Sequence, residues 1–216
     1  MANKKRDYQN EYPSVTTVLG ILRKIGLEMW FKFTPIKQIQ EESERGRLIG
    51  TEIHEAIQSY IETGKAELQT QYAEEVKTAL QGFIAFKKDH PEYIFKRSEI
   101  ALTSEVYGFN GTLDCLAEKD GLLIADWKTG NAKKKDLPDI YDEYVYQVAA
   151  YVYLYNEINK TNINRAFILS LAKDKAAYNY REIGEVEIKG AFEEVFLPAL
   201  KIYNYQKREK ANGIQK

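Results

Sequence analysis

The sequence predicts one α/β domain, with a central mixed sheet flanked by helices and an N-terminal helical layer. Apolar residues recur at steps of three and four through the first ninety residues, as in amphipathic helices. Beyond them, short β-like runs separated by turns take over, and a further helix divides these runs into two groups. The chain has 216 residues, 44% of them hydrophobic, which suffices for a single core. We therefore treat residues 1–216 as one domain, with a disordered tail at 1–12, a helical layer at 13–92 and an α/β core at 93–216.

Three helical segments are expected in the helical layer. Ser14 is a suitable N-cap, because its side chain can accept from the unpaired N–H groups at the start of a helix. Pro35 interrupts the next helical stretch, and Gly64 stops it. Pro91 ends the third, since the residue before a proline avoids the helical conformation. We expect the first helix to start after Ser14 and the others to cover about 38–63 and 68–89.

Strands and tight turns follow the helical layer. The glycines in Tyr107–Gly111 and Lys119–Gly121 indicate two turns. Between the second turn and Asp126 the chain is wholly apolar, as in a strand buried on both faces. We expect strands at about 93–102, 111–118 and 122–128. Beyond a polar loop at 129–138, we expect a helix at 139–158, strands at 165–172 and 178–188, and a closing helix at 190–209.

Composition excludes several classes of protein. Cys115 is the single cysteine, so this chain alone forms no disulfide and no four-cysteine zinc or iron–sulfur site. The polar start of the sequence lacks the apolar segment of a signal peptide, and no stretch is long enough for a membrane span. We expect a soluble, cytoplasmic protein. The net charge of −1 means that any binding of nucleic acid depends on local clusters of Lys and Arg.

The apolar strand ends abruptly in charged residues. Asp126 and Lys128 are two residues apart, so both side chains leave the same face of the strand near its C-terminal end. Asp114 lies on the preceding strand, and the tight turn midway between the two aspartates predicts a hairpin that places them nearly opposite each other. Clustered carboxylates can hold the Mg²⁺ ions that hydrolysis of a phosphodiester requires, and a lysine can polarise water. The alternatives are a surface salt bridge for the Asp-Trp-Lys tripeptide and a turn residue for Asp114.

Five motifs in order resemble the RecB-like exonuclease branch of the PD-(D/E)XK nucleases, which includes lambda-type and AddB-type nuclease domains. The likeness runs from about residue 46 to 155, and the opening Tyr12-Pro13-Ser14-Val15-Thr16-Thr17 is similar to the start of phage and mitochondrial exonucleases of this kind. The five motifs are Gly50-Thr51-Glu52-Ile53-His54, the strand glutamate Glu99, Gly111-Thr112-Leu113-Asp114, Asp126-Trp127-Lys128 and Gln147-Val148-Ala149-Ala150-Tyr151. The resemblance implies a restriction-endonuclease-like core.

The resemblance also implies a role for each site residue. His54, Asp114, Asp126 and the backbone carbonyl of Trp127 would bind Mg²⁺ or Mn²⁺, with Glu99 as a further candidate. Lys128 would position or activate the attacking water. Some relatives hold an iron–sulfur cluster on cysteines, which Cys115 alone does not provide, so a cluster-free nuclease is implied.

Gln147 and Tyr151 would support the site and the DNA. Four residues apart on a helix, they share one face.

Each role has a structural alternative. His54 falls at helical spacing with Ile57 and is also compatible with a hydrogen-bonded core histidine. Tyr151 could pack in a core helix in which Gln147 is merely tolerated. Glu99 could lie on a solvent-exposed face of its strand.

Basic residues near these motifs are candidates for contacts with DNA phosphates. Their alternative is a solvated surface. They are Lys133, Lys134 and Lys135 after the charged strand, and Arg45 and Arg47 ahead of His54.

The resemblance thus implies a metal-dependent DNA exonuclease that acts on linear DNA with water as the nucleophile, whereas spacing and composition do not distinguish end-dependent cutting from endonuclease cutting. Two alternatives stay open: a structure-specific endonuclease or nuclease subunit, and a non-catalytic nucleic-acid-binding module that keeps the fold. The chain contains no GxxxxGK[ST] helicase motif, so any unwinding would come from a recombination or helicase partner. A homo-oligomer is also compatible with the sequence.

Overall fold

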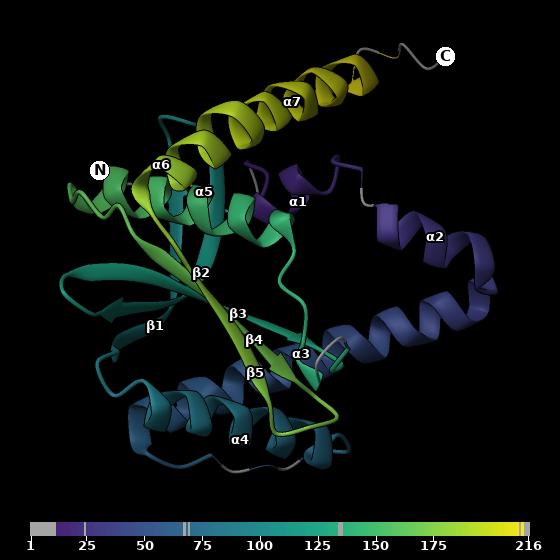
Figure 1. Ribbon diagram of the computed structural model, residues 1–216. Coiled ribbons are helices and arrows are strands. Elements are labelled where there is room, and N and C mark those ends of the chain that lie inside the picture. The colour runs from purple at the N-terminus through teal and green to yellow at the C-terminus, as the bar shows by residue number, and fades with distance from the viewer. Residues whose placement is uncertain are drawn as a thin grey trace, which may run out of the picture.

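The computed structural model describes residues 12–23, 25–66, 68, 70–133, 136–211 and 213. The predicted disordered tail therefore lies almost entirely outside the described residues. Figure 1 shows a central twisted sheet with helices on both faces, which confirms the predicted α/β fold and its N-terminal helical layer. No helix in the described part of the chain combines the length and the apolar character needed to cross a membrane.

Four helices precede the sheet in the described part of the chain, and the first of them packs on the face opposite to the third and fourth. They are α1 (Val15–Leu19), α2 (Ile25–Phe33), α3 (Ile36–Thr63) and α4 (Ala73–Asp89). The Oγ of Ser14 accepts from the backbone N–H of Thr17 at 3.1 Å, which confirms the predicted N-cap. Gly64 ends α3 with a φ of 76°, a conformation that glycine adopts without steric cost.

Within the described residues, five strands form one sheet in the order β1-β2-β3-β4-β5. Strands β3 and β4 are parallel, and the other neighbouring pairs are antiparallel. The crossover between β3 and β4 is the helix α5 (Asp142–Asn159). The strands are β1 (Ile94–Ser104), β2 (Phe109–Glu118), β3 (Leu122–Gly130), β4 (Ala166–Ala172) and β5 (Tyr178–Ile183).

Two sequence predictions about this part of the chain are wrong in detail. The turn predicted at Tyr107–Gly111 lies earlier, at 105–108, where Gly108 has a φ of 74°. The strand predicted to continue to residue 188 ends at Ile183, and α6 (Glu185–Gly190) begins after Gly184. The helical turn brings Ile188 into the same core cluster as Ile183, and the acidic residues in the first turn of α6 favour a helix start.

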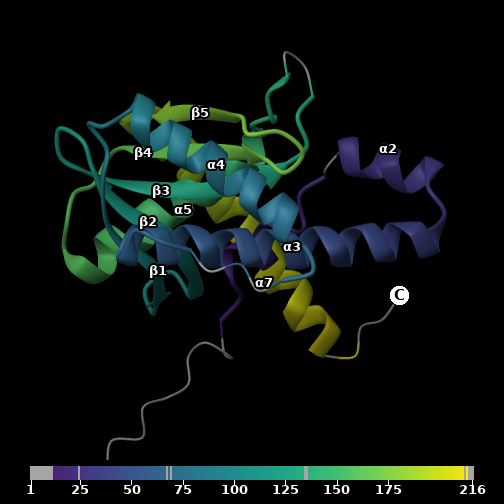
Figure 2. The same cartoon turned by 90° about the horizontal axis from the view of Figure 1, so that it is seen from below.

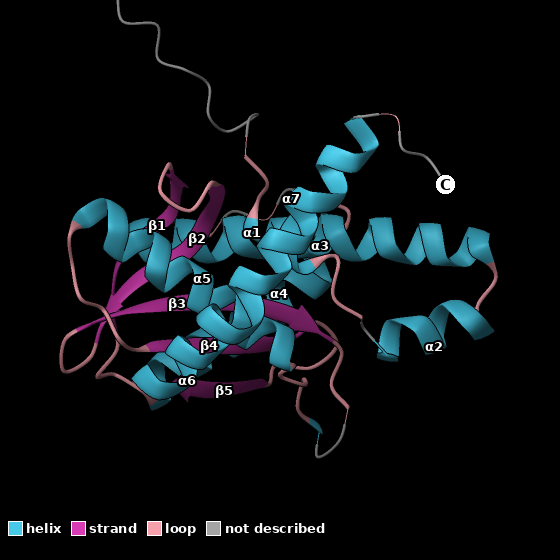
Figure 3. Ribbon diagram, turned by 90° about the horizontal axis from the view of Figure 1, so that it is seen from above, coloured by secondary structure: helices cyan, strands magenta, loops and turns pink. Residues whose placement is uncertain are grey.

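The sheet separates two hydrophobic cores. The α5-side core lies under α1, α5, α6, the π-helical turn η3 (Ala191–Phe196) and α7 (Leu197–Ala211). The α3-side core lies between the opposite face and the helices α3 and α4, as Figure 2 shows. Viewed from above, α2 and the first half of α3 project beyond the edge of the sheet, so the second half of α3 is the part that packs on it (Figure 3).

Candidate active site

The alternation of side chains between the two faces of the sheet reverses in β2 at Asp114. Leu113 packs in the α5-side core, whereas Cys115, two residues later, packs in the α3-side core. Residues two apart share a face in a regular strand, so the alternation reverses between them. Glu99 lies across from Asp114 on β1, between the pairs Ser98↔Cys115 and Ile100↔Leu113, and has a φ of 50°. A left-handed glutamate within a strand is strained, and such residues gather at functional sites.

The carboxylate of Asp114 takes over a backbone role in the sheet. The pairing of β2 with β3 runs up to Cys115↔Ala125. Beyond it, the backbone N–H of Trp127 donates to Oδ2 of Asp114 at 2.6 Å. Burial tends to raise the pKa of Asp114, but His54, Lys128 and this N–H together lower it. Asp114 is therefore an ionised carboxylate held against the Trp127 peptide.

His54 brings helix α3 into the site. Its Nδ1 lies 3.3 Å from Oδ1 of Asp114. Burial tends to lower the pKa of His54, but the Asp114 carboxylate outweighs it and the pKa is raised. The carboxylate of Glu99 completes the group, because one ligand atom from each of these three residues lies within 4.8 Å of the others. They line an open pocket of about 470 Å³ together with residues of α3.

Asp126 is fully buried, with 0% of its surface exposed. Its Oδ1 accepts from Nε2 of Gln147 at 3.3 Å. Its Oδ2 lies 2.6 Å from Nζ of Lys128 as an ion pair, but the alignment is not that of a hydrogen bond, and Oδ2 has no hydrogen-bond partner among the described residues. Burial, the main cause, and the neighbouring Asp114 raise the pKa of Asp126 to about 6, although Lys128 lowers it.

Helix α5 supplies the support on the other face of the sheet. Gln147 Nε2 also donates to the hydroxyl of Tyr151 at 3.0 Å, so the two predicted support residues are joined to each other and to Asp126. Lys128 Nζ lies 5.2 Å from the centre of the Tyr144 ring, a cation–π arrangement that our sequence reasoning missed. The available signal was the spacing of Tyr144, three residues before Gln147 and on the same helix face.

Gly111 has no side chain, which allows the Tyr151 ring to lie close to the backbone of β2. A Cβ at this position would lie 2.7 Å from Cε1 of Tyr151 and 3.3 Å from Cγ2 of Val15. We expect Gly111→Ala to destabilise the fold by about 1–3 kcal/mol, as overpacking does, and to displace Tyr151 from Gln147. Urea unfolding measures the first effect. Gly130→Ala, where nothing lies within 4 Å of the added Cβ, is the control, and equal stability of the two variants would contradict the expectation.

The predicted DNA-contact residues differ in their surroundings. Arg47 lines the active-site pocket and pairs with Glu44 at 2.7 Å. Arg45 forms an ion pair with Glu75 on α4. Lys133 donates to the hydroxyl of Tyr141 at 2.6 Å and lies 3.2 Å from Asp139. The predicted contacts Lys134 and Lys135 lie outside the described residues.

The donor set suits a divalent cation. One imidazole and two carboxylates converge at His54, Glu99 and Asp114. Carboxylate oxygens are the ligands that Mg²⁺ and Mn²⁺ prefer, and an imidazole completes many transition-metal sites. The buried Oδ2 of Asp126, without a hydrogen-bond partner among the described residues, offers a further acceptor next to this group. The site can therefore hold a metal ion.

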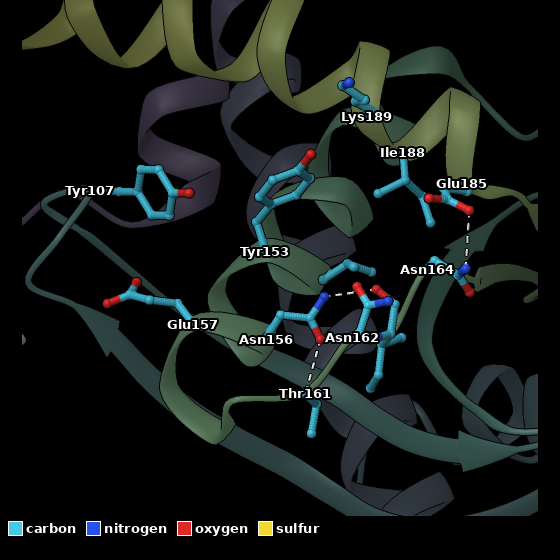
Figure 4. A pocket seen from close by; sticks show the side chains of 12 residues that line it. Tyr107, Tyr153, Asn156, Glu157, Thr161, Asn162, Asn164, Glu185, Ile188 and Lys189 are labelled. Carbon is cyan, nitrogen blue, oxygen red and sulfur yellow. Dashed lines mark hydrogen bonds between the residues drawn. The ribbon is translucent and has the colours of Figure 1, made fainter.

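A separate hollow of about 390 Å³ lies between the end of α5 and α6 (Figure 4) and shares no lining residue with the active-site pocket. Its polar groups largely bind one another. The side chain of Asn156 donates to the carbonyl of Ile163 at 2.7 Å and accepts from Thr161 at 2.8 Å. Asn164 donates to Glu185 at 3.1 Å. These contacts hold the loop before β4 in place, whereas Oε2 of Glu157, which also lines the hollow, is buried without a hydrogen-bond partner among the described residues.

Comparison with known proteins identifies a family and similar folds. Residues 28–212 match the family model described as the PD-(D/E)XK nuclease superfamily. A putative exonuclease from Eubacterium rectale has a similar structure, with a TM-score of 0.59 and 17% identity over 100% of this chain and 89% of that chain. A phage-related exonuclease from Haemophilus somnus 129PT is less similar, with a TM-score of 0.42 and 12% identity over 93% and 97% of the two chains. No curated protein matches by sequence.

The family model covers most of the chain, including every motif from His54 to Tyr151. The Eubacterium rectale structure shows the same fold, a restriction-endonuclease-like mixed sheet between helices. The chain belongs to the PD-(D/E)XK nuclease superfamily.

Proposed function

We propose that this protein is a Mg²⁺- or Mn²⁺-dependent deoxyribonuclease that degrades linear DNA from its ends. The observation that carries the proposal is the fully buried Asp126 carboxylate, whose Oδ2 forms an ion pair with Lys128 and has no other partner among the described residues. An ionisable group in such a position is costly unless it serves binding or catalysis. The superfamily implies a nucleic-acid substrate, and DNA is the specific expectation of the motif pattern.

The side chains have distinct roles in this proposal. His54, Glu99, Asp114 and Asp126 would hold the cation, with the Trp127 carbonyl as a further ligand. A bound Mg²⁺ or Mn²⁺ supplies Lewis-acid polarisation of the phosphate and lowers the pKa of water.

Lys128 would orient the attacking water. Its ammonium is steered toward Asp126 by the ion pair and lies beside the Tyr144 ring, with only 16% of the side chain exposed. A low-dielectric setting strengthens its interaction with charge that develops on the phosphate.

Gln147 and Tyr151 would act through Asp126. Their hydrogen bonds fix the orientation of the carboxylate that Lys128 faces. A carboxylate fixed in advance lowers the reorganisation needed when charge develops at the reacting phosphate.

Digestion of linear and closed-circular DNA of the same sequence tests the proposal. We expect linear DNA to be lost with Mg²⁺ or Mn²⁺ and to persist in EDTA, while circles survive because they have no ends. Cutting of circles at a similar rate would assign an endonuclease. Intact DNA with every metal, combined with tight DNA binding, would replace the enzyme with a non-catalytic binding module.

A further inference from the structure

A second pocket of about 340 Å³ lies next to the active site, at the edge of the sheet where β3 and β4 end side by side. Parallel strands end at the same edge, and Lys128 and Gly130 on β3 pair with Ser170 and Ala172 on β4. The chain after β4 continues this contact, because the N–H of Lys173 donates to the carbonyl of Gly130 at 2.8 Å. Lys173 is one of the residues that line the pocket.

The two pockets are neighbours. A Cβ built on Gly50, which lines the active-site pocket, would lie 3.5 Å from Oγ1 of Thr129, which lines the second pocket. Thr129 follows Lys128 directly. A polynucleotide strand bound over Lys128 therefore reaches the second pocket within a short distance along its backbone.

Lys173 differs from the other basic residues near the site. It is half-buried, and no carboxylate of the described residues lies within ion-pair distance of its ammonium. The acids that surround it have other partners: Glu75 pairs with Arg45, and Asp174 accepts from the N–H of Ala132 at 2.9 Å. An ammonium without a carboxylate partner, on a residue that lines a pocket, is suited to bind an anion.

The charged groups around Lys173 also favour an anion site at its ammonium. Burial, the larger cause, and the neighbouring Arg45 guanidinium both lower the pKa of Lys173, while Glu75 and Asp174 raise it. An anion bound to the Lys173 ammonium would offset its repulsion from the Arg45 guanidinium. By contrast, Lys133 in the same pocket is already engaged by Asp139 and Tyr141.

We propose that Lys173 binds a backbone phosphate of the substrate strand, next to the phosphate that is cleaved. This inference rests on the proposed nuclease function and adds a residue that the sequence motifs do not include. Because the contact is to the backbone, it adds affinity irrespective of base sequence. Lys173 is a binding residue in this scheme and takes no part in the chemical step.

Equilibrium binding of a fluorescently labelled DNA duplex tests the inference separately from cleavage. The full chain would be measured in EDTA by fluorescence anisotropy, at salt concentrations from about 50 to 200 mM. Three variants are compared with the wild type: Lys173→Gln, Lys173→Arg and, as the matched control, Lys175→Gln. Lys175 is in the same loop, has 51% of its side chain exposed, pairs with Asp136 and does not line the pocket.

We expect Lys173→Gln to raise the Kd about tenfold and to reduce the slope of log Kd against log salt by about one. Lys173→Arg should retain most of the affinity, and Lys175→Gln should stay within about twofold of the wild type. If Lys173→Gln matches Lys175→Gln in both Kd and slope, the inference is wrong. It is also wrong if Lys173→Arg loses as much affinity as Lys173→Gln, since that outcome indicates a packing role.

The two proposals fail in distinguishable ways. A wild type that does not cleave DNA, with a Lys173→Gln variant that binds it more weakly, would remove the nuclease function and leave the phosphate contact in place. A wild type that cleaves DNA, with unchanged binding in Lys173→Gln, would support the nuclease function and overturn the phosphate contact. A wild type that does not bind DNA would overturn the inference.

Discussion

The Lys128→Met variant is expected to cleave linear DNA about a hundred- to a thousandfold more slowly than the wild type. Methionine keeps a long side chain beside the Tyr144 ring but removes the ammonium that lies 2.6 Å from Asp126. The loss should therefore appear in the chemical step. Single-turnover cleavage with protein in excess over DNA measures that step without product release.

The matched control is Lys175→Met, which removes the same charge from an exposed position outside both pockets. Its single-turnover rate should equal that of the wild type. A Lys128→Met rate within threefold of the control would exclude Lys128 from the chemical step. Thermal unfolding of both variants shows whether a lost rate reflects a lost fold.

The Asp126→Asn variant should be inactive and yet more stable than the wild type in EDTA. Because burial raises the pKa of Asp126 to about 6, the folded state holds a proton that the unfolded state releases nearer pH 4. The free energy of unfolding therefore falls as pH rises from about 4 to 6, and the charged form costs about 3 kcal/mol at pH 7. Asparagine carries no charge and keeps an oxygen that can accept from Lys128 or Gln147.

Differential scanning calorimetry at several pH values tests this expectation. At pH 7 the melting temperature should rise by roughly 5–10 °C, and the difference should shrink toward zero below pH 4. Asp120→Asn, at the exposed hairpin turn, is the control and should show little change at either pH. A lower melting temperature for Asp126→Asn at pH 7 would mean that the ion pair with Lys128 stabilises the fold more than burial of the carboxylate destabilises it.

The features of the active site that destabilise the fold are confined to a few residues. Glu99 adopts a strained φ of 50°, β2 reverses its alternation at Asp114, and Asp126 is a buried carboxylate with an unsatisfied oxygen. None of these features stabilises the folded protein when no metal ion is bound. A cation bound among them would offset the repulsion between the carboxylates, which is the expected trade between stability and activity.

Local patterns determined the element order and the central hairpin. Helical spacing, the Ser14 cap and the two glycine turns act over a few residues, so they can be read from neighbours in the chain. The same holds for Asp126 and Lys128, since a period of two puts both on one face. Misplaced boundaries occurred where tertiary packing competes with local preference, as for Ile188, which packs in the core from a helix rather than from a strand.

Pairing between distant segments could be anticipated only in part. The hairpin predicted that Asp114 and Asp126 lie nearly opposite each other, and the register Cys115↔Ala125 agrees with it. The sequence did not indicate that the Asp114 side chain replaces a backbone partner for Trp127, because that requires the reversal of β2. It likewise left Glu99 ambiguous between the solvent face and the site. In the structure Glu99 is exposed, and one of its carboxylate oxygens lies within 4.8 Å of ligand atoms of His54 and Asp114.

Spacing along the chain is sufficient to predict the fold class, the family motifs and the acids and lysine at the end of β3. Tertiary packing is needed to bring His54 on α3 to Asp114, to place Tyr144 beside Lys128, and to put Lys173 in the lining of a pocket next to the active site. These neighbours come from segments far apart in the sequence. Their contacts depend on how the helices pack on a twisted sheet, and no local pattern in one chain encodes that geometry.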